Sequence, residues 1–219
     1  MTSIWKKSIG KNNIRKYAFN VENILKRDKT MSKQAKSLTS VEVKRVLEFI
    51  ALKKHSARNR AMFLVALYAG LRVGEVASLR YMDVLGVDDE IRDEIRLDAS
   101  ITKGNVARTV FVNTKLRKEL ANYIKAVPYK HLADKLFYTQ KNEGFTANTL
   151  TQFFYYLFGS IGIAGASSHS MRRTFITTLA NKGVSVRLLA SLVGHKNIST
   201  TQFYIDVNDD QKRSAVELV

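Results

Sequence analysis

Residues 68–75 read Tyr-Ala-Gly-Leu-Arg-Val-Gly-Glu, a stretch that predicts the end of one helix, a turn and the start of another. The first helix, over 56–69, is expected to stop at Gly70, because glycine readily adopts the left-handed conformation that often follows a helix. Arg72 then opens the next, short helix. A positive charge at that end opposes the helix dipole, so it calls for an acid or an anion beside it. An ion pair with Glu75, a solvated side chain and a bound anion all remain open.

Helical spacing also dominates the rest of the chain. Thr39 and Glu42 form a capping box, which marks a helix start. Two segments, 94–98 and 108–112, instead alternate apolar and polar residues, and Lys-Gly-Asn at 103–105 supplies a turn between them. These patterns predict a mainly α fold with one small antiparallel β-sheet (α+β). Further helices are expected over 74–79, 114–127, 146–159, 170–181, 185–193 and 199–207, and from 208 onward.

The composition excludes several classes of protein. The chain has 219 residues, of which 45% are hydrophobic and 25% charged, so it supports a packed core and is not wholly disordered. Because it contains no cysteine, disulfides, thiolate metal sites and cysteine catalysis are excluded. Its apolar runs fall short of the roughly 20 residues that a bilayer span needs, and its N-terminus lacks a signal-peptide pattern. We therefore expect a soluble cytoplasmic protein with no membrane partner.

A formal net charge of +17 favours a nucleic-acid partner, since Lys and Arg side chains neutralise phosphates and release their counterions. A ribosomal-type structural role and simple solubility are the alternatives. Nearly half of the charge lies in residues 1–40, where ten basic residues stand against two acidic ones, a net charge of +8. Apolar spacing over 14–25 predicts one amphipathic helix in this arm. The arm either wraps nucleic acid or is simply solvated, and its candidate DNA contacts are Lys6, Lys7, Lys11, Arg15 and Lys16.

Three more segments carry polar residues that a purely structural domain would not need. Lys103 lies at the tip of the predicted hairpin, where exposed lysines are common. His169 and Arg172 share one face at the start of a helix, where backbone N–H groups and the helix dipole favour a phosphate. His195 follows a helix-stopping glycine, and Tyr204 comes nine residues later within a short helix. Taken one at a time, these segments are better explained by packing or solvation than by a functional site.

Taken together and in order, these segments resemble the catalytic domain of the tyrosine recombinase (phage integrase) family. The pattern of that family is Arg, Lys, His-x-x-Arg, His or Trp, and Tyr. The resemblance extends from about residue 38 to the end of the chain, and all six positions are occupied. The similar segments are Ala69-Gly-Leu-Arg72, Thr102-Lys103-Gly104, His169-Ser-Met-Arg172 and Leu192-Val-Gly-His195, followed by Tyr204.

The resemblance implies the recombinase catalytic-domain fold and a reaction that integrates, excises or inverts DNA. In such a site-specific recombinase, Tyr204 would cleave a DNA strand and form a 3′-phosphotyrosyl intermediate, which preserves the energy of the phosphodiester bond. A phenol with a reference pKa of about 10 must lose its proton as it attacks. Lys103 would protonate the departing 5′ oxygen as a general acid.

The remaining positions of the pattern would stabilise the charge that develops on the phosphate. Arg72 and Arg172 would clamp the non-bridging oxygens. His169 would act as a hydrogen-bond partner or base, and His195 would donate a hydrogen bond to the transition state. These groups take the place of metal ions, and no cluster of acids suggests a metal site, so we expect neither a metal nor a cofactor.

Two residues beside the pattern also bear on the site. Glu75 lies three residues after Arg72 and either supports it or lies on the surface. Arg173 occupies a place where family members often carry a histidine, and with Lys196 it is a candidate DNA contact. The C-terminal tail has two open interpretations: it is either a short hydrophobic plug that docks on another protomer or a frayed end. The apolar residues of the tail are Ala215, Val216, Leu218 and Val219.

The expected domains are a basic arm with one helix over 1–37 and a catalytic domain with a short tail over 38–219. The arm is too short for the separate DNA-binding domain that full-length members usually carry. The chain therefore resembles short members of the family, such as fimbrial-switch inversion recombinases, and phage- or mobile-element-encoded helpers of a host's Xer recombinases. We expect double-stranded DNA and other recombinase protomers, self or host Xer-type, as partners, with nucleoid association when DNA is bound. The alternative is a non-catalytic architectural or activating factor for a Xer-type recombinase.

Overall fold

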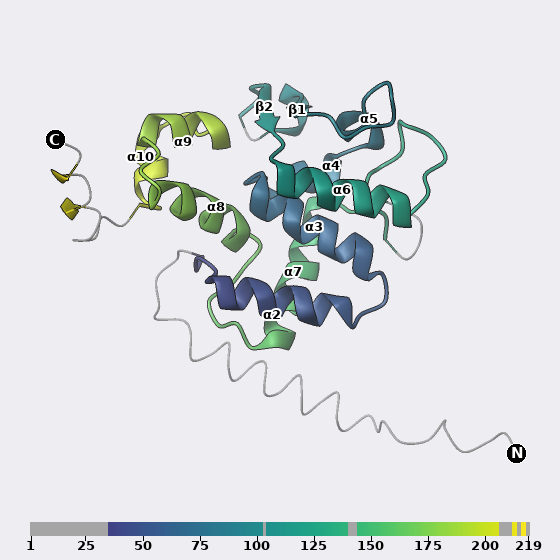
Figure 1. The fold of residues 1–219 in the computed structure, drawn as a ribbon, viewed down its shortest axis with the longest axis horizontal. Helices are drawn as coiled ribbons and strands as arrows, with labels where there is room; N and C mark the ends of the chain where they lie inside the picture. The colour runs from purple at the N-terminus through teal and green to yellow at the C-terminus, as the bar shows by residue number, and fades with distance from the viewer. Residues whose placement is uncertain (1–34, 103, 140–143, 206–211, 214–215, 218–219) are drawn as a thin grey trace, which may run out of the picture. The chain divides into compact units, whose positions relative to one another are not determined.

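The computed structural model describes residues 35–102, 104–139, 144–205, 212–213 and 216–217, and this part of the chain is mostly helical (Figure 1). Most of the predicted basic arm, residues 1–34, lies outside the described residues, as does Lys103. Within the described residues, no helix is long and apolar enough to cross a membrane. The helices are α2 (Ser40–Ala51), α3 (Ser56–Tyr68), α4 (Val73–Ser78), α5 (Tyr81–Val84), α6 (Thr114–Ala126), α7 (Ala147–Ile161), α8 (Ser170–Ala180), α9 (Val186–Val193) and α10 (Ile198–Gln202).

The central helix is α3, which packs against α2, α4, α6 and α8. Residues 61–67 are all buried, so the C-terminal half of α3 is apolar around its whole circumference. Ahead of it, α2 begins as predicted, with the Thr39 side chain accepting a hydrogen bond from the Glu42 backbone N–H. Gly70 follows α3 at φ +60°, and a Cβ at this position would lie 2.6 Å from the ring of Phe175. The glycine therefore ends α3 as predicted and lets α8 approach closely.

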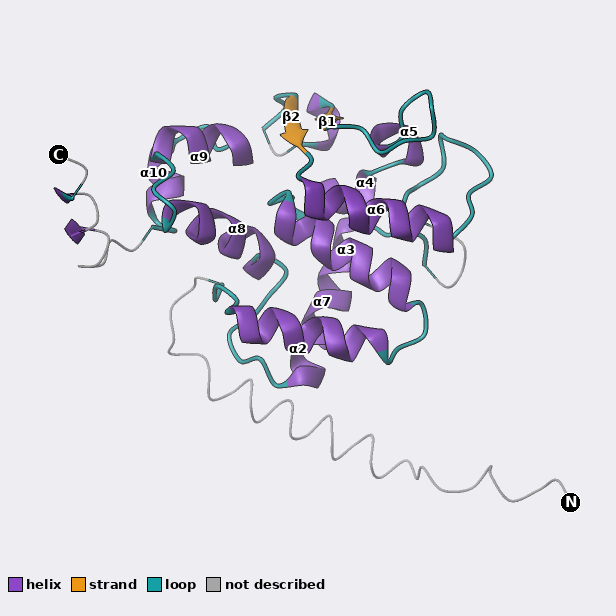
Figure 2. Ribbon diagram, viewed as in Figure 1, coloured by secondary structure: helices purple, strands orange, loops and turns teal. Residues whose placement is uncertain are grey.

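The sheet is a two-stranded antiparallel hairpin formed by β1 (Glu94–Leu97) and β2 (Arg108–Phe111), as the alternation predicts (Figure 2). Its register pairs Ile95 with Val110 and Leu97 with Arg108. With this sheet among the helices, the predicted mainly α (α+β) fold class is confirmed. The structure adds α5 and the 3₁₀ turn η1 (Ala99–Ile101), which span four and three residues and are too short for hydrophobic periodicity to reveal.

One apolar face of α7 packs into the core. The helix ends two residues beyond the predicted range of 146–159, at Gly162 in the left-handed conformation. Tyr155 and Tyr156, on the other face, are exposed. A single buried stripe is typical of a helix that covers one side of a core. The residues of this stripe are Leu150, Phe154, Leu157 and Phe158.

The C-terminal helices α8, α9 and α10 lie together on one side of the larger helical body (Figure 1). They carry a small apolar cluster of their own, in which Ile176, Leu189 and Val193 are buried. The large core cluster instead takes its residues from α2 to α7 and both strands, with Met171 as its contribution from α8. The described domain thus has one large core and one small one.

The helix expected over 199–207 is wrong at its C-terminal end, because α10 stops at Gln202 and Tyr204 lies in the turn that follows. There the Tyr204 N–H donates to the Thr201 carbonyl at 3.0 Å, and the Ile205 N–H donates to the Gln202 carbonyl at 3.0 Å. Bonds to the third residue back tighten the chain into a turn. The helix expected from 208 and most of the apolar tail lie outside the described residues.

Candidate active site

Arg72 is the N-cap residue of α4 and pairs with the acid three residues later. Its backbone N–H donates to Glu75 Oε2 at 2.7 Å, and its Nη1 donates to Oε1 at 3.0 Å. Glu75 is 1% exposed, whereas the Arg72 side chain is 21% exposed. Of the alternatives open for Arg72, the ion pair with Glu75 is the one observed. A buried carboxylate thus orients a guanidinium that solvent still reaches.

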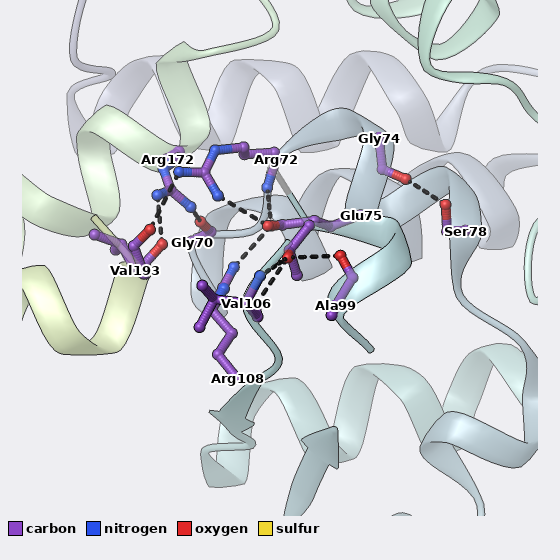
Figure 3. A network of polar contacts seen from close by, with 12 residues as sticks. Gly70, Arg72, Gly74, Glu75, Ser78, Ala99, Val106, Arg108, Arg172 and Val193 are labelled. Atoms are coloured by element: carbon purple, nitrogen blue, oxygen red, sulfur yellow. Dashed lines mark hydrogen bonds and ion pairs between the residues drawn. The ribbon is translucent and has the colours of Figure 1, made fainter. Parts of the chain in front are cut away.

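A second arginine, Arg108 at the start of β2, reaches the same carboxylate. Figure 3 shows Arg72 and Arg108 converging on Glu75. Arg108 Nη2 donates to Glu75 Oε2 at 2.7 Å. Arg108 is a site residue that was not predicted from the sequence, although the alternation that predicts β2 puts it on the same face as the buried Val110. An arginine on the apolar face of a strand needs a buried acceptor, and that requirement is the signal that would have found it.

A third arginine, Arg172 on α8, is 3% exposed. Its Nη1 donates to the Gly70 carbonyl at 2.7 Å and its Nη2 to the Val193 carbonyl at 2.5 Å, as Figure 3 shows. These bonds connect α8 to the ends of α3 and α9. Burial, followed by the positive charge of Arg72, lowers the pKa of Arg172 to about 9. The guanidinium therefore still carries its charge at neutral pH.

His195 follows α9 and is held by a buried hydroxyl. Its Nδ1 lies 2.9 Å from Thr201 Oγ1, and Thr201 is fully buried in α10. Burial first, and then the charges of Arg172, Arg72 and Arg108, lower the pKa of His195 to about 4. The imidazole is therefore neutral at pH 7. Thr201 was not predicted from the sequence, because its hydroxyl acts through a contact that only the fold creates.

Tyr204 lies half-buried beside this histidine. The two rings are stacked, with centroids 5.9 Å apart and an angle of 22° between their planes. The guanidinium carbon of Arg173 lies 5.5 Å from the centroid of the Tyr204 ring, within range of a cation–π interaction. Arg173, a candidate DNA contact in the sequence, thus contacts the candidate nucleophile.

A pocket of about 160 Å³ opens between the hairpin and the turn after α9, and its lining includes Arg72, Arg108, His195 and Lys196. Lys196 lies over the hairpin, because a Cβ on Gly104 would be 2.8 Å from Lys196 Cε. The pocket therefore presents cationic and imidazole groups, a lining suited to a phosphate. Among the described residues, no three His, Asp or Glu side chains are grouped so as to hold a metal ion.

The structure thus brings together four residues of the predicted pattern: Arg72, Arg172, His195 and Tyr204. His169 is the N-cap residue of α8, three residues before Arg172, and is exposed. Lys103 and the five candidate contacts of the arm lie outside the described residues.

Residues 36–211 match the family described as the phage integrase family. The chain belongs to this family. The resemblance found in the sequence is thereby confirmed at the level of the family.

Two curated relatives show how much of a family member the chain represents. Tyrosine recombinase XerC of Caldanaerobacter subterraneus subsp. tengcongensis is 32% identical over 184 residues, which are 82% of this chain and 49% of that protein. Tyrosine recombinase XerA of Pyrococcus furiosus is 28% identical over 186 residues, 83% of this chain and 61% of that protein. The chain therefore spans about half to three-fifths of the length of these relatives.

Solved structures agree with the family assignment. The crystal structure of XerA recombinase has a TM-score of 0.67 and 25% identity, over 87% of this chain and 65% of that one. The Tn1549 transposon integrase in complex with circular intermediate DNA has a TM-score of 0.64 and 22% identity, over 94% of this chain and 77% of that one. The recombinase catalytic-domain fold is thus confirmed.

Proposed function

We propose that the chain is a site-specific DNA strand transferase that uses Tyr204 as its nucleophile. The phenolic oxygen attacks the phosphorus of a phosphodiester, the bond from phosphorus to the 5′ oxygen breaks, and a 3′-phosphotyrosyl link forms. The phenol loses its proton, and the 5′ oxygen gains one on leaving. Attack by a 5′ hydroxyl reverses the step and rejoins DNA. The grouping of Arg72, Arg172 and His195 around Tyr204 carries this proposal.

The two arginines supply the charge that this reaction needs. In the transition state, negative charge is distributed over the non-bridging phosphate oxygens. Cations stabilise this charge most effectively when they are already in place and need not reorganise. Arg172 is held by two backbone carbonyls and Arg72 by Glu75, so neither guanidinium has to be ordered when DNA binds. Both retain further N–H donors for phosphate oxygens.

The histidines and Lys103 complete the proposed proton and hydrogen-bond chemistry. His195 is neutral at pH 7 and its Nδ1 lies 2.9 Å from the Thr201 hydroxyl. We assign it the tautomer in which Nδ1 accepts from that hydroxyl, since only this tautomer leaves an Nε2–H to donate to the phosphate. His169 assists the departure of the phenolic proton from the start of α8. Lys103, assigned through the family resemblance, protonates the 5′ oxygen.

The same proposal covers the DNA contacts and the partners. Residues 38–219 form the catalytic domain, and the arm over 1–37 supplies phosphate contacts through its Lys and Arg side chains, with Arg173 and Lys196 beside the site. The enzyme would act on double-stranded DNA in the cytoplasm, associate with the nucleoid, and assemble with other recombinase protomers, its own or a Xer-type partner. An activating, non-catalytic factor for a Xer-type recombinase is the second candidate, and the experiment below separates the two.

The test is denaturing capture of protein-linked DNA from cells that carry the gene, with sequencing of the linked fragments. The wild type and Tyr156→Phe, which alters an exposed tyrosine on α7, are expected to link DNA at one recurring sequence, and Tyr204→Phe is not. An adduct that persists in Tyr204→Phe would refute the assignment of the nucleophile. If no variant forms an adduct and recombination by another enzyme is stimulated equally by all, the activating role is correct instead.

A further inference from the structure

Arg108 is buried where three segments of the candidate site meet. It stands at the start of β2, its side chain is 9% exposed, and it faces Glu75 of α4 and the end of α9. Figure 3 shows its guanidinium directed at Glu75, and the same guanidinium also donates to the Leu192 carbonyl at the end of α9. The reaction proposed above does not use Arg108.

The contacts of Arg108 use two separate nitrogens. Nη2 donates to Glu75 Oε2 at 2.7 Å, and Nη1 donates to the Leu192 carbonyl at 3.1 Å. Glu75 in turn holds Arg72 through both its backbone N–H and its Nη1. Leu192 lies three residues before His195 in the chain. The Arg108 guanidinium therefore connects Glu75, which supports Arg72, with the turn that carries His195.

The fit around Arg108 is tight. Gly194 has φ +66°, and a Cβ there would lie 2.6 Å from Arg108 Cδ and 3.0 Å from its Nε. That Nε is buried and has no hydrogen-bond partner among the described residues. Burial lowers the pKa of Arg108, which means that the surroundings oppose its charge. A buried ion pair is weak evidence for a stabilising role, so a positioning role is the better explanation of this arrangement.

We propose that Arg108 is a positioning residue for strand transfer, which holds Glu75 and the Leu192 carbonyl at a fixed spacing and thereby places Arg72 and His195 around one phosphate. This inference rests on the proposed function of the site. Arginine suits the task because its planar fork donates to two acceptors at once, whereas lysine offers one compact charge on a flexible stem. Charge and geometry can therefore be separated by substitution.

Three full-length variants make the test. Arg108→Met removes charge and fork, Arg108→Lys keeps the charge alone, and Arg96→Met removes an exposed arginine from the other strand of the hairpin as the matched control. We expect both Arg108 variants to lower the yield of protein-linked DNA in cells by about tenfold or more, since small misplacements of reacting groups are costly. Affinity for a random-sequence 40-base-pair duplex should change less than about twofold, because non-specific binding depends on total charge. Arg96→Met should match the wild type in adduct yield.

A second measurement needs neither a target sequence nor catalysis. Three arginines, Arg172, Arg72 and Arg108, depress the pKa of His195 in addition to burial. In NMR titrations of the purified protein, Arg108→Met should therefore raise that pKa above about 4, while Arg108→Lys and Arg96→Met should leave it near the wild-type value. A structural defect alone would not distinguish methionine from lysine in this way.

Each result supports or overturns the proposal. Loss of adduct in both Arg108 variants, with duplex affinity retained and the His195 pKa raised in Arg108→Met alone, supports a positioning role. A wild-type adduct yield in Arg108→Lys shows that charge suffices and overturns the positioning role. If the wild type itself forms no adduct, the proposed function fails, and the titration still decides whether Arg108 acts on His195. Should Arg108→Met not fold, Arg108→Lys alone decides between charge and geometry.

Discussion

The two sides of the candidate site are packed in different ways. Arg72 and Glu75 stand on α4, whose Val76 and Ala77 belong to the large core, and Arg108 stands on a strand that shares this core. His195 instead follows α9, which contributes to the small cluster, and Tyr204 packs against that cluster. We call these the cation side and the nucleophile side. Regions with few buried apolar contacts open more readily, so the nucleophile side is expected to move first.

Polar contacts take the place of a large core on the nucleophile side. Arg172 donates to carbonyls at the ends of α3 and α9, Thr201 holds His195, and Arg173 contacts the Tyr204 ring. The difference teaches that the segments carrying Arg72, Glu75 and Arg108 are fixed by deep packing, whereas Arg172, His195 and Tyr204 depend on directional contacts that DNA or another protomer can reorganise.

Removing the buried carboxylate should cause the largest loss of stability. We expect Glu75→Gln to lower the free energy of unfolding by about 3–5 kcal/mol, because Arg72 and Arg108 both lose the buried carboxylate charge that pairs with them. The matched control is Asp83→Asn: Asp83 holds the same capping position in α5 and accepts from the Arg80 N–H, yet stabilises no such cluster. Its cost should stay near ~1 kcal/mol in urea unfolding. Equal losses would show that the cation side needs only a helix cap.

A cavity in the large core should destabilise the whole domain, whereas a matched cavity in the small core should destabilise mainly the C-terminal helices. Leu64 and Leu189 are both buried, one in the large core and one in the small. Leu64→Ala should destabilise the whole domain by about 2–5 kcal/mol. Leu189→Ala should accelerate amide hydrogen exchange mainly over 170–202, with less effect elsewhere. Faster exchange throughout the domain in both variants would contradict a separate, weaker nucleophile side.

Acid should weaken the nucleophile side in particular. Burial and the neighbouring arginines hold the pKa of His195 at about 4, below its ordinary value of about 6.5, so the unfolded chain binds a proton in this range that the folded protein does not. Stability should therefore fall as the pH drops from about 6.5 to about 4. Urea midpoints measured across this range should fall less steeply in His195→Asn, and as steeply as in the wild type in His131→Asn. An identical slope in His195→Asn would refute the assignment.

The smallest expected effect concerns Arg173. A cation–π interaction at a half-exposed site contributes about 0.5–1 kcal/mol, so Arg173→Met should lower the yield of protein-linked DNA by roughly 2–5-fold. Arg187→Met, on the exposed face of α9, serves as the control for lost positive charge near the site. Equal yields from both variants would mean that Arg173 acts through charge alone and not through the Tyr204 ring.

The sequence predicted the architecture well where local rules determine it. Thr39 caps α2 and Gly70 ends α3 as expected, because capping and left-handed turns depend on residue type. It also predicted Arg72, Arg172, His195 and Tyr204 as candidate site residues, and the fold brings these four together. It could not give the end of α10, where a turn replaces the last helical residues, nor the contact of Thr201 with His195, which arises from tertiary packing. Arg108 could have been predicted from the sequence, because the alternation of β2 places it on the buried face of the strand.

The most direct measurement locates the DNA link on the protein. Protein-linked DNA captured from cells is digested with nuclease and trypsin, and the peptides are identified by mass spectrometry. Cleavage after Lys196 and Lys212 yields a peptide of residues 197–212, whose only tyrosine is Tyr204. We predict that this peptide carries the nucleotide on Tyr204. A nucleotide on any other residue, with this peptide unmodified, would contradict the assignment of the nucleophile side.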